Sequence, residues 1–197
     1  MTDKEIYESQ EYVISNLNTF GITDSMWASG YPMSTEIGYL DEPSQALTYY
    51  CFYGYDKDSS DQTMQMQNAV ARSECLGKAP IGSGHDNYLN GIVAQFDLTF
   101  TIKAWTEAER YHFFDFVSSQ STMHRLQKMD VAESCIKYVD SRVIDVAEEL
   151  VRKYNENSNL ENRRRMLYSC PTGLKLTDRM RTNYRQLKMI YHQRKDH

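Results

Sequence analysis

The sequence predicts an α+β fold from three observations. Residues 92–104 carry β-branched and aromatic side chains in partial alternation, which is the pattern of a strand with one buried face. Residues 141–156 and about 176–195 each repeat apolar side chains at helical spacing, so each predicts a long amphipathic helix. A strand and two long helices in one chain indicate a mixed α+β fold.

Shorter segments complete the expected order of elements. Residues 4–17 have apolar side chains at mostly helical spacing and predict a helix. Residues 61–76 predict a second helix, and residues 77–84 predict a loop because they contain three glycines and a proline. Thr106 precedes two glutamates and predicts the N-cap of a helix that continues through residues 107–117.

The length of 197 residues fits one large domain, or one domain with an appendage. We expect residues 1–60 to form an N-terminal extension or subdomain, and residues 61–197 to form the main domain. The extension contains a run of tyrosines within residues 49–55. Two interpretations of that run stay open, because tyrosine-dense segments form strands or loops packed against a partner.

Composition narrows the class of protein. Hydrophobic residues make up 41% of the chain and charged residues 25%, which argues against disorder over most of its length. The mean hydropathy of −0.65 and the lack of a long apolar run predict no transmembrane helix, and the N-terminus has no secretory pattern. Four widely separated cysteines predict neither a disulfide scaffold nor a metal site, so we expect a cytoplasmic protein.

The net charge of −5 hides an asymmetry between the two halves of the chain. Residues 1–100 hold 14 acidic and 4 basic side chains, whereas residues 101–197 hold 13 acidic and 18 basic ones. Residues 158–197 alone hold 10 basic and 3 acidic side chains. Such a basic excess attracts phosphates, nucleotides or nucleic acid, although a solvated helix face would have the same composition.

Two clusters carry side chains suited to binding an anionic or heterocyclic ligand. The first runs from Gln120 to His124 and Arg125, whose ring and guanidinium donors suit phosphate or a flavin pyrophosphate. The second holds Asn183 and Arg194, eleven residues apart and so close to three helical turns, where amide and guanidinium groups would recognise a planar heterocycle. An exposed helix end and a solvated basic face are the alternatives for the two clusters. The sequence Ile81-Gly82-Ser83-Gly84-His85 lacks the lysine of a phosphate loop and fits a plain turn better.

At these clusters the sequence resembles the flavin-dependent thymidylate synthase family over about residues 65–197. The family motif Q-x-x-R-H-R matches Gln120, His124 and Arg125 in spacing. A second family signature matches the following residues in order: Pro171, Asn183, Arg185, Leu187 and Arg194. The strand FDLTFTIK and the run Ala71-Arg72-Ser73 also resemble family segments.

The chain departs from the family mainly in the nucleotide half of the motif. Met123 stands where the family has the first Arg of R-H-R, and Val131 stands where it has Glu. Gln95 stands where the family strand usually carries His. The residues that correspond to the flavin half of the family's site are therefore better retained than those of its nucleotide half.

The resemblance implies an antiparallel sheet packed with long helices, and a homotetramer that binds FAD between subunits. It implies methylation, or a related one-carbon transfer, at C5 of dUMP or a similar pyrimidine nucleotide, with NADPH and methylenetetrahydrofolate as co-substrates. It assigns flavin contacts to His124, Arg125, Asn183 and Arg185. It assigns catalytic contacts with the pyrimidine to Gln120 and Arg194.

Two other functions stay open at the level of sequence. The altered nucleotide motif and the acidic, tyrosine-rich residues 1–60 favour a catalytically inactive relative that binds a nucleotide or a protein partner. Residues 158–197 have the charge of a nucleic-acid-binding segment, but the acidic first half and the lack of a known module argue against that function.

Overall fold

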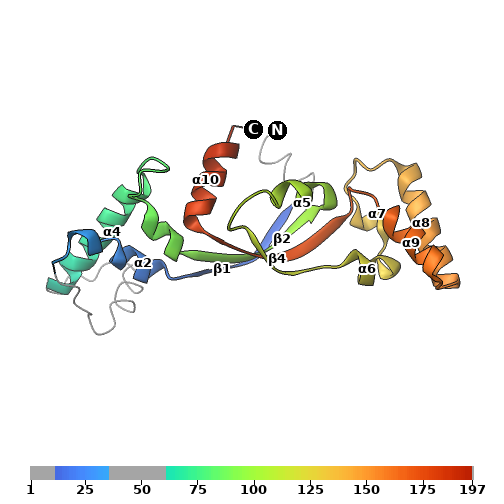
Figure 1. Cartoon of the computed structure of the whole chain (residues 1–197), viewed down its shortest axis with the longest axis horizontal. Coiled ribbons are helices and arrows are strands. Elements are labelled where there is room, and N and C mark those ends of the chain that lie inside the picture. The colour runs from blue at the N-terminus through green and yellow to red at the C-terminus, as the bar shows by residue number, and fades with distance from the viewer. Residues whose placement is uncertain (1–11, 36–60, 197) are drawn as a thin grey trace. The chain divides into compact units, whose positions relative to one another are not determined.

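The structure is a computed structural model that describes residues 12–35 and 61–196 (Figure 1). The described residues divide into two compact units. The first unit contains residues 12–17 and 95–181, and the second contains residues 18–35, 61–94 and 182–196. The boundary expected at residue 60 and the tyrosine run lie outside the described residues, so the division into an extension and a main domain stays a prediction.

Four strands form one sheet in the order β1-β2-β4-β3. Their bounds are Val13–Phe20 (β1), Val93–Thr101 (β2), Asp115–Ser119 (β3) and Lys175–Asn183 (β4). Strands β3 and β4 pair antiparallel, from Asp115 opposite Arg181 to Ser119 opposite Asp178. The prediction of an α+β fold with an antiparallel sheet is confirmed.

Strand β2 confirms the strand predicted within residues 92–104 but ends three residues earlier than predicted. Its buried side chains alternate, with Ala94, Phe96 and Leu98 inside, as the pattern of residues 92–104 predicts. The strand ends at Thr101, however, because its Oγ1 accepts a hydrogen bond from the N–H of Ala104 at 3.1 Å and caps the helix α5, Ile102–Ala108.

The helix expected from Thr106 onward is therefore wrong in its bounds. Thr106 lies inside α5, which ends at Ala108. Phe113 has a positive φ of 57°, which interrupts any helix there, and strand β3 begins two residues later. The aromatic residues of this segment therefore belong to a turn and an edge strand.

Two further predictions are corrected by strands. Residues 13–17 of the expected first helix belong to β1, whose apolar side chains lie exposed at the edge of the sheet, and residues 4–11 lie outside the described residues. The last expected helix is half strand, because β4 occupies residues up to Asn183 and only Tyr184–Arg194 (α10) is helical. Buried Asp178, Met180 and Thr182 alternate along β4, which is the period of a strand.

The core of the first unit lies among its helices. Helix α8, Ser141–Glu156, has the predicted bounds and is capped by Asp140, whose Oδ1 accepts the N–H of Arg142. Helix α9, Leu160–Tyr168, lies beside α8 (Figure 1). Short helices α6 (Thr122–Arg125), η3 (Leu126–Lys128) and α7 (Val131–Ser134) complete this part of the unit.

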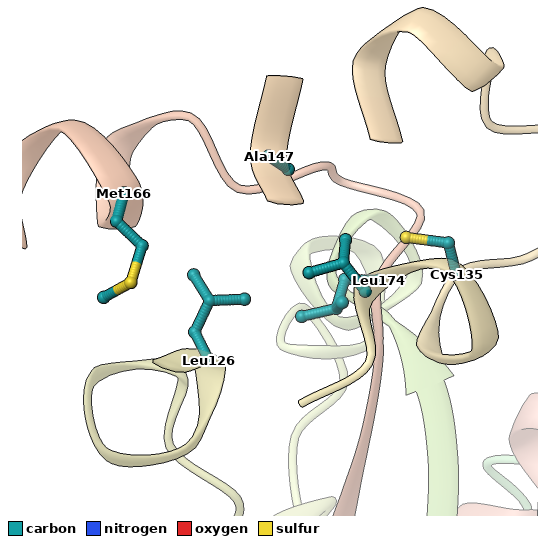
Figure 2. Close-up of a cluster of buried hydrophobic side chains, with 6 residues drawn as sticks. Leu126, Cys135, Ala147, Met166 and Leu174 are labelled. Carbon is teal, nitrogen blue, oxygen red and sulfur yellow. The ribbon is translucent and has the colours of Figure 1, made fainter. Parts of the chain in front are cut away.

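Figure 2 shows the buried side chains that these helices enclose, with Leu126 and Met166 pointing toward one another. The cluster consists of Leu126, Val131, Cys135, Ala147, Met166 and Leu174. Gly173 lies beside it, and a Cβ at this position would collide with Cγ2 of Val139. The backbone N–H of Ile136 donates to the carbonyl of Gly173 at 3.0 Å, so this close approach joins two segments.

The second unit packs α2 (Ile22–Ala28), η1 (Tyr31–Met33), α4 (Asp61–Gly77), η2 (Asn87–Gly91) and α10. The predicted helix at 61–76 and the loop that follows it are confirmed. Arg72 of α4 donates from Nε to Oγ of Ser29 at 3.0 Å and from Nη2 to the carbonyl of Trp27 at 3.4 Å. The guanidinium thus satisfies the C-terminal end of α2, where carbonyls lack helical partners.

Candidate functional site

The six predicted site residues are divided between the two units. Gln120, His124 and Arg125 belong to the first unit, and Asn183, Arg185 and Arg194 belong to the second.

Gln120 follows strand β3 and is held against β4. Its backbone N–H donates to the carbonyl of Thr177 at 3.2 Å and to Oδ1 of Asp178 at 3.1 Å. Its side-chain Oε1 accepts the N–H of Thr177 at 3.1 Å. Because the amide oxygen is committed to the sheet, the amide nitrogen Nε2 is the part of Gln120 suited to contact a ligand.

Asp178 is the acidic residue that holds Gln120 in place, and it is only 4% exposed. Burial raises the pKa of its carboxyl group, and the hydrogen bond from the backbone of Gln120 opposes that effect. No motif in the sequence points to Asp178 as part of the site. Its partner is 58 residues away in the chain, so spacing within a motif gave no signal for it.

His124 and Arg125 form the last turn of α6. His124 is exposed, whereas Arg125 is partly buried. The Nη1 atom of Arg125 is buried and has no hydrogen-bond partner among the described residues. A buried guanidinium nitrogen without an acceptor is destabilising, so this atom calls for an acceptor from outside the described residues, such as water or an anionic ligand.

Asn183 lies at the junction of β4 and α10. Its backbone is extended, and its Oδ1 accepts the N–H of Gln186 at 2.8 Å, which makes it the N-cap of α10. Asn183 therefore precedes the helix, and the helical spacing predicted between Asn183 and Arg194 is wrong at its first residue. Arg194 is the last residue of α10, so the helix separates these two residues along its whole length.

Arg185, in the first turn of α10, forms an ion pair with a residue that the sequence analysis did not single out. Its Nε lies 3.3 Å from Oδ1 of Asp86, which is fully buried. Nζ of Lys188 lies 2.8 Å from Oδ2 of the same carboxylate. Burial raises the pKa of Asp86, but the hydrogen bond and charge of Lys188 and the charge of Arg185 outweigh it, so the pKa lies below its ordinary value.

Oδ1 of Asp86 forms only the ion pair with Arg185 and accepts no hydrogen bond among the described residues. Two further buried polar atoms of the second unit also have no hydrogen-bond partner there. They are Oγ1 of Thr182 and Nε2 of Gln186, on either side of the cap residue Asn183. Both can donate a hydrogen bond. The start of α10 therefore combines unmatched donors with the positive end of a helix dipole, which is a setting that favours an anionic or carbonyl-bearing group.

The other described residues were searched for a metal site, a cavity and a membrane-spanning helix. They contain no group of three or more His, Cys, Asp or Glu side chains placed to hold a metal ion. A hollow of about 460 Å³ lies in the first unit beside α7 and α8, and none of the six predicted residues lines it. No helix in the described part of the chain combines the length and the apolar character that crossing a membrane requires.

Comparison with known proteins finds similarity in fold but not in sequence. No protein-family profile matches the sequence, and no curated protein matches it. Solved structures do match the fold. One is the crystal structure of thymidylate synthase X (ThyX) from Helicobacter pylori with FAD and dUMP, with a TM-score of 0.56 and 13% identity. A second structure of the H. pylori flavin-dependent enzyme, also complexed with FAD and dUMP, has a TM-score of 0.55 and 13% identity.

Both matches cover 94% of this chain and 84% of the matched chain. Agreement over nearly the whole chain establishes a likeness of architecture, whereas 13% identity carries no statement about activity. The chain therefore has a fold similar to that of the flavin-dependent thymidylate synthase ThyX.

Proposed function

We propose that the chain is a divergent flavin-dependent thymidylate synthase that binds FAD and methylates dUMP, or a similar pyrimidine nucleotide, at C5. The proposal includes a homotetrameric assembly, and residues 61–197 as the family domain behind an N-terminal extension at 1–60. The fold likeness to ThyX supports it, together with the family spacing of Gln120, His124 and Arg125. The single observation that carries the flavin step is the buried, unmatched Nη1 of Arg125.

The residues present fit a flavin nucleotide. His124 and Arg125 offer donors for phosphate oxygens, and Arg125 already holds one buried donor without an acceptor. Asn183 keeps its Nδ2 group for a ring carbonyl, because only its Oδ1 is used by the cap. When bound, FAD would supply the reducing equivalents of the reaction, with NADPH as the source and methylenetetrahydrofolate as the one-carbon donor.

Gln120 and Arg194 have the chemistry for the pyrimidine. The Nε2 group of Gln120 can donate to a ring carbonyl while its Oε1 remains fixed to Thr177. Arg194 at the end of α10 would hold a uracil carbonyl by charge-assisted hydrogen bonds and stabilise negative charge that develops on it. No side-chain nucleophile is needed for these roles.

The second candidate is an inactive relative that binds a nucleotide or a protein partner. The replacement of family residues by Met123 and Val131 in the motif, and by Gln95 in the strand, favours it. This candidate shares the fold and the flavin-side residues with the first, so turnover is the property that separates the two.

The visible spectrum of the purified protein tests the flavin step, because bound flavin absorbs near ~450 nm. We expect this band in the wild type and its loss in Arg125→Leu. Arg142→Leu is the matched control, because Arg142 is exposed and pairs only with neighbouring Asp140 among the described residues. A colourless wild type that also fails to bind added FAD would overturn the proposal. Bound FAD without turnover of dUMP, NADPH and methylenetetrahydrofolate would favour the inactive relative.

A further inference from the structure

A buried acidic residue joins the loop after α4 to helix α10 in the second unit. Asp86 ends that loop, directly before η2, and is 0% exposed. Its two carboxylate oxygens meet two cations that lie three residues apart in the first turns of α10, Arg185 on Oδ1 and Lys188 on Oδ2. Residues with this spacing lie on the same side of a helix, so both cations face the loop.

Lys188 and Arg185 use this carboxylate in different ways. Nζ of Lys188 also donates to the carbonyl of Ala79 at 2.6 Å, so its charge is held between two groups of the loop. Arg185 approaches with Nε, at 3.3 Å, and its side chain is 34% exposed. The fork nitrogens Nη1 and Nη2 have no ion-pair partner among the described residues.

The charges of this group do not cancel. One buried carboxylate faces two cations, so one positive charge is left over at the partly exposed end of Arg185. A guanidinium that is ion-paired at Nε, here without a hydrogen bond to Oδ1, still presents its planar fork, the geometry that binds a phosphate or carboxylate through two parallel hydrogen bonds. An unpaired arginine would lose side-chain entropy on binding, whereas one already held in place loses less.

We propose that Asp86 is a positioning residue, which fixes the guanidinium of Arg185 so that its fork meets the anionic part of the bound flavin nucleotide. The inference rests on the proposed flavin binding, and it adds a residue that no motif of the sequence includes. Asp86 itself does not touch the ligand. It acts through Arg185, while Lys188 balances the buried charge and anchors the loop.

The alternative is that Asp86 only fastens the loop to α10. A buried carboxylate needs partners in either case, so the loss of stability in a variant does not separate the two roles. The two roles differ in how the effect on flavin affinity depends on Arg185.

A double-mutant cycle makes this distinction. Asp86→Asn keeps the shape of the side chain and removes its charge, and Arg185→Met removes the guanidinium. We expect Asp86→Asn to weaken FAD binding by roughly tenfold or more, and to have no further effect in the Arg185→Met background. Asp97→Asn is the matched control, since Asp97 pairs with Arg179 in the first unit, and it should leave FAD affinity unchanged.

Lys188→Met adds a test that does not require Asp86→Asn to fold. It removes the anchor to Ala79 but leaves Asp86 paired with Arg185, so FAD affinity should stay within about twofold of wild type. A loss of affinity in Lys188→Met equal to that in Arg185→Met would overturn the positioning role. So would an effect of Asp86→Asn that is the same in both backgrounds.

The outcomes also separate this inference from the proposed function. If the wild type binds FAD and Asp86→Asn binds it equally well, only the role of Asp86 is wrong. If the wild type binds no FAD, the proposed function fails, and the positioning role is overturned with it.

Discussion

The carboxylate of Asp178 accepts the backbone N–H of Gln120 at 3.1 Å in a place where almost no water reaches it. Strand β4 therefore places a buried carboxyl group in hydrogen-bond contact with the backbone of a residue proposed to contact the pyrimidine. Because burial raises the pKa of Asp178, the ionised carboxylate is less favourable in the folded chain than in the unfolded one.

Asp178→Asn should therefore raise the melting temperature near pH 7 or leave it unchanged. The asparagine keeps an acceptor for Gln120 and removes the buried charge. The folded pKa is the higher one, so the penalty of Asp178 grows as pH rises from about 4 through the folded pKa, and the difference between variant and wild type should grow with it. Thermal melts from pH 3 to pH 8 measure this.

Asp97→Asn should show the opposite dependence. Hydrogen bonds from Asn16 and Arg179 lower the pKa of Asp97, so its stabilising effect is present above about pH 4 and disappears as pH falls through the folded pKa. The same series of melts checks it. A melting-temperature difference of one sign for both variants would contradict the assignment of these two environments.

Substitutions of Asn183 should separate helix capping from ligand binding. Asn183→Ala removes the cap of α10 and should lower the free energy of unfolding by about 0.5–2 kcal/mol. Asn183→Asp keeps the oxygen acceptor, so it should fold like the wild type, but it lacks the Nδ2 donor proposed for the flavin. Urea unfolding with FAD titration measures both properties, and full FAD affinity in Asn183→Asp would exclude that contact.

Arg194→Ala should spare folding and flavin binding but abolish nucleotide methylation. Losing one donor at a developing oxyanion costs roughly 3–4 kcal/mol, which is about a hundredfold or more in rate. A cation that only interacts with the helix dipole contributes about 0.3–1 kcal/mol to stability. The methylation rate, together with a calorimetric titration of dUMP into both proteins, distinguishes these roles, and an equal rate and equal affinity would remove Arg194 from the site.

The thiols of Cys75 and Cys170 should differ strongly in their reactivity with iodoacetamide. Cys75 is exposed, whereas burial, with a smaller effect of Cys135, raises the pKa of Cys170 to about 11. The thiolate is the reactive form, so near pH 7.5 Cys75 should be modified first and Cys170 only after unfolding. Peptide mass spectrometry follows each site. Rapid modification of Cys170 in the folded protein would contradict the raised pKa of its thiol.

The sequence predicted elements whose pattern comes from one buried face. Helix α8 has the predicted bounds because its apolar side chains repeat with the period of a helix, and β2 was found because its buried side chains alternate. The segment 175–194 was misread because a strand with a period of two passes directly into a helix. Met180 and Leu187 can be placed on one face of a single helix by their spacing. In the structure Met180 belongs to β4 and Leu187 to α10, because the period changes at Asn183.

The site residues were predictable only where a motif spans few residues. Gln120, His124 and Arg125 lie within six positions, whereas Asp86 meets Lys188 at a separation of 102 residues. Pairing across such a distance follows from tertiary packing, which single-sequence spacing does not report. The sequence also did not predict that the side-chain oxygens of Gln120 and Asn183 accept hydrogen bonds from backbone N–H groups. Only the amide nitrogens of these two side chains are therefore proposed as ligand contacts.

The contact of Gly173 with Val139 links the substitution histories of the two positions. Since any side chain at 173 would meet Cγ2 of Val139, relatives with alanine at 173 should carry a smaller residue at 139. The two changes should be tolerated in the order 139 first, because the reverse order passes through a strained intermediate. Gly173→Ala should therefore be more harmful alone than when Val139→Ala is already present.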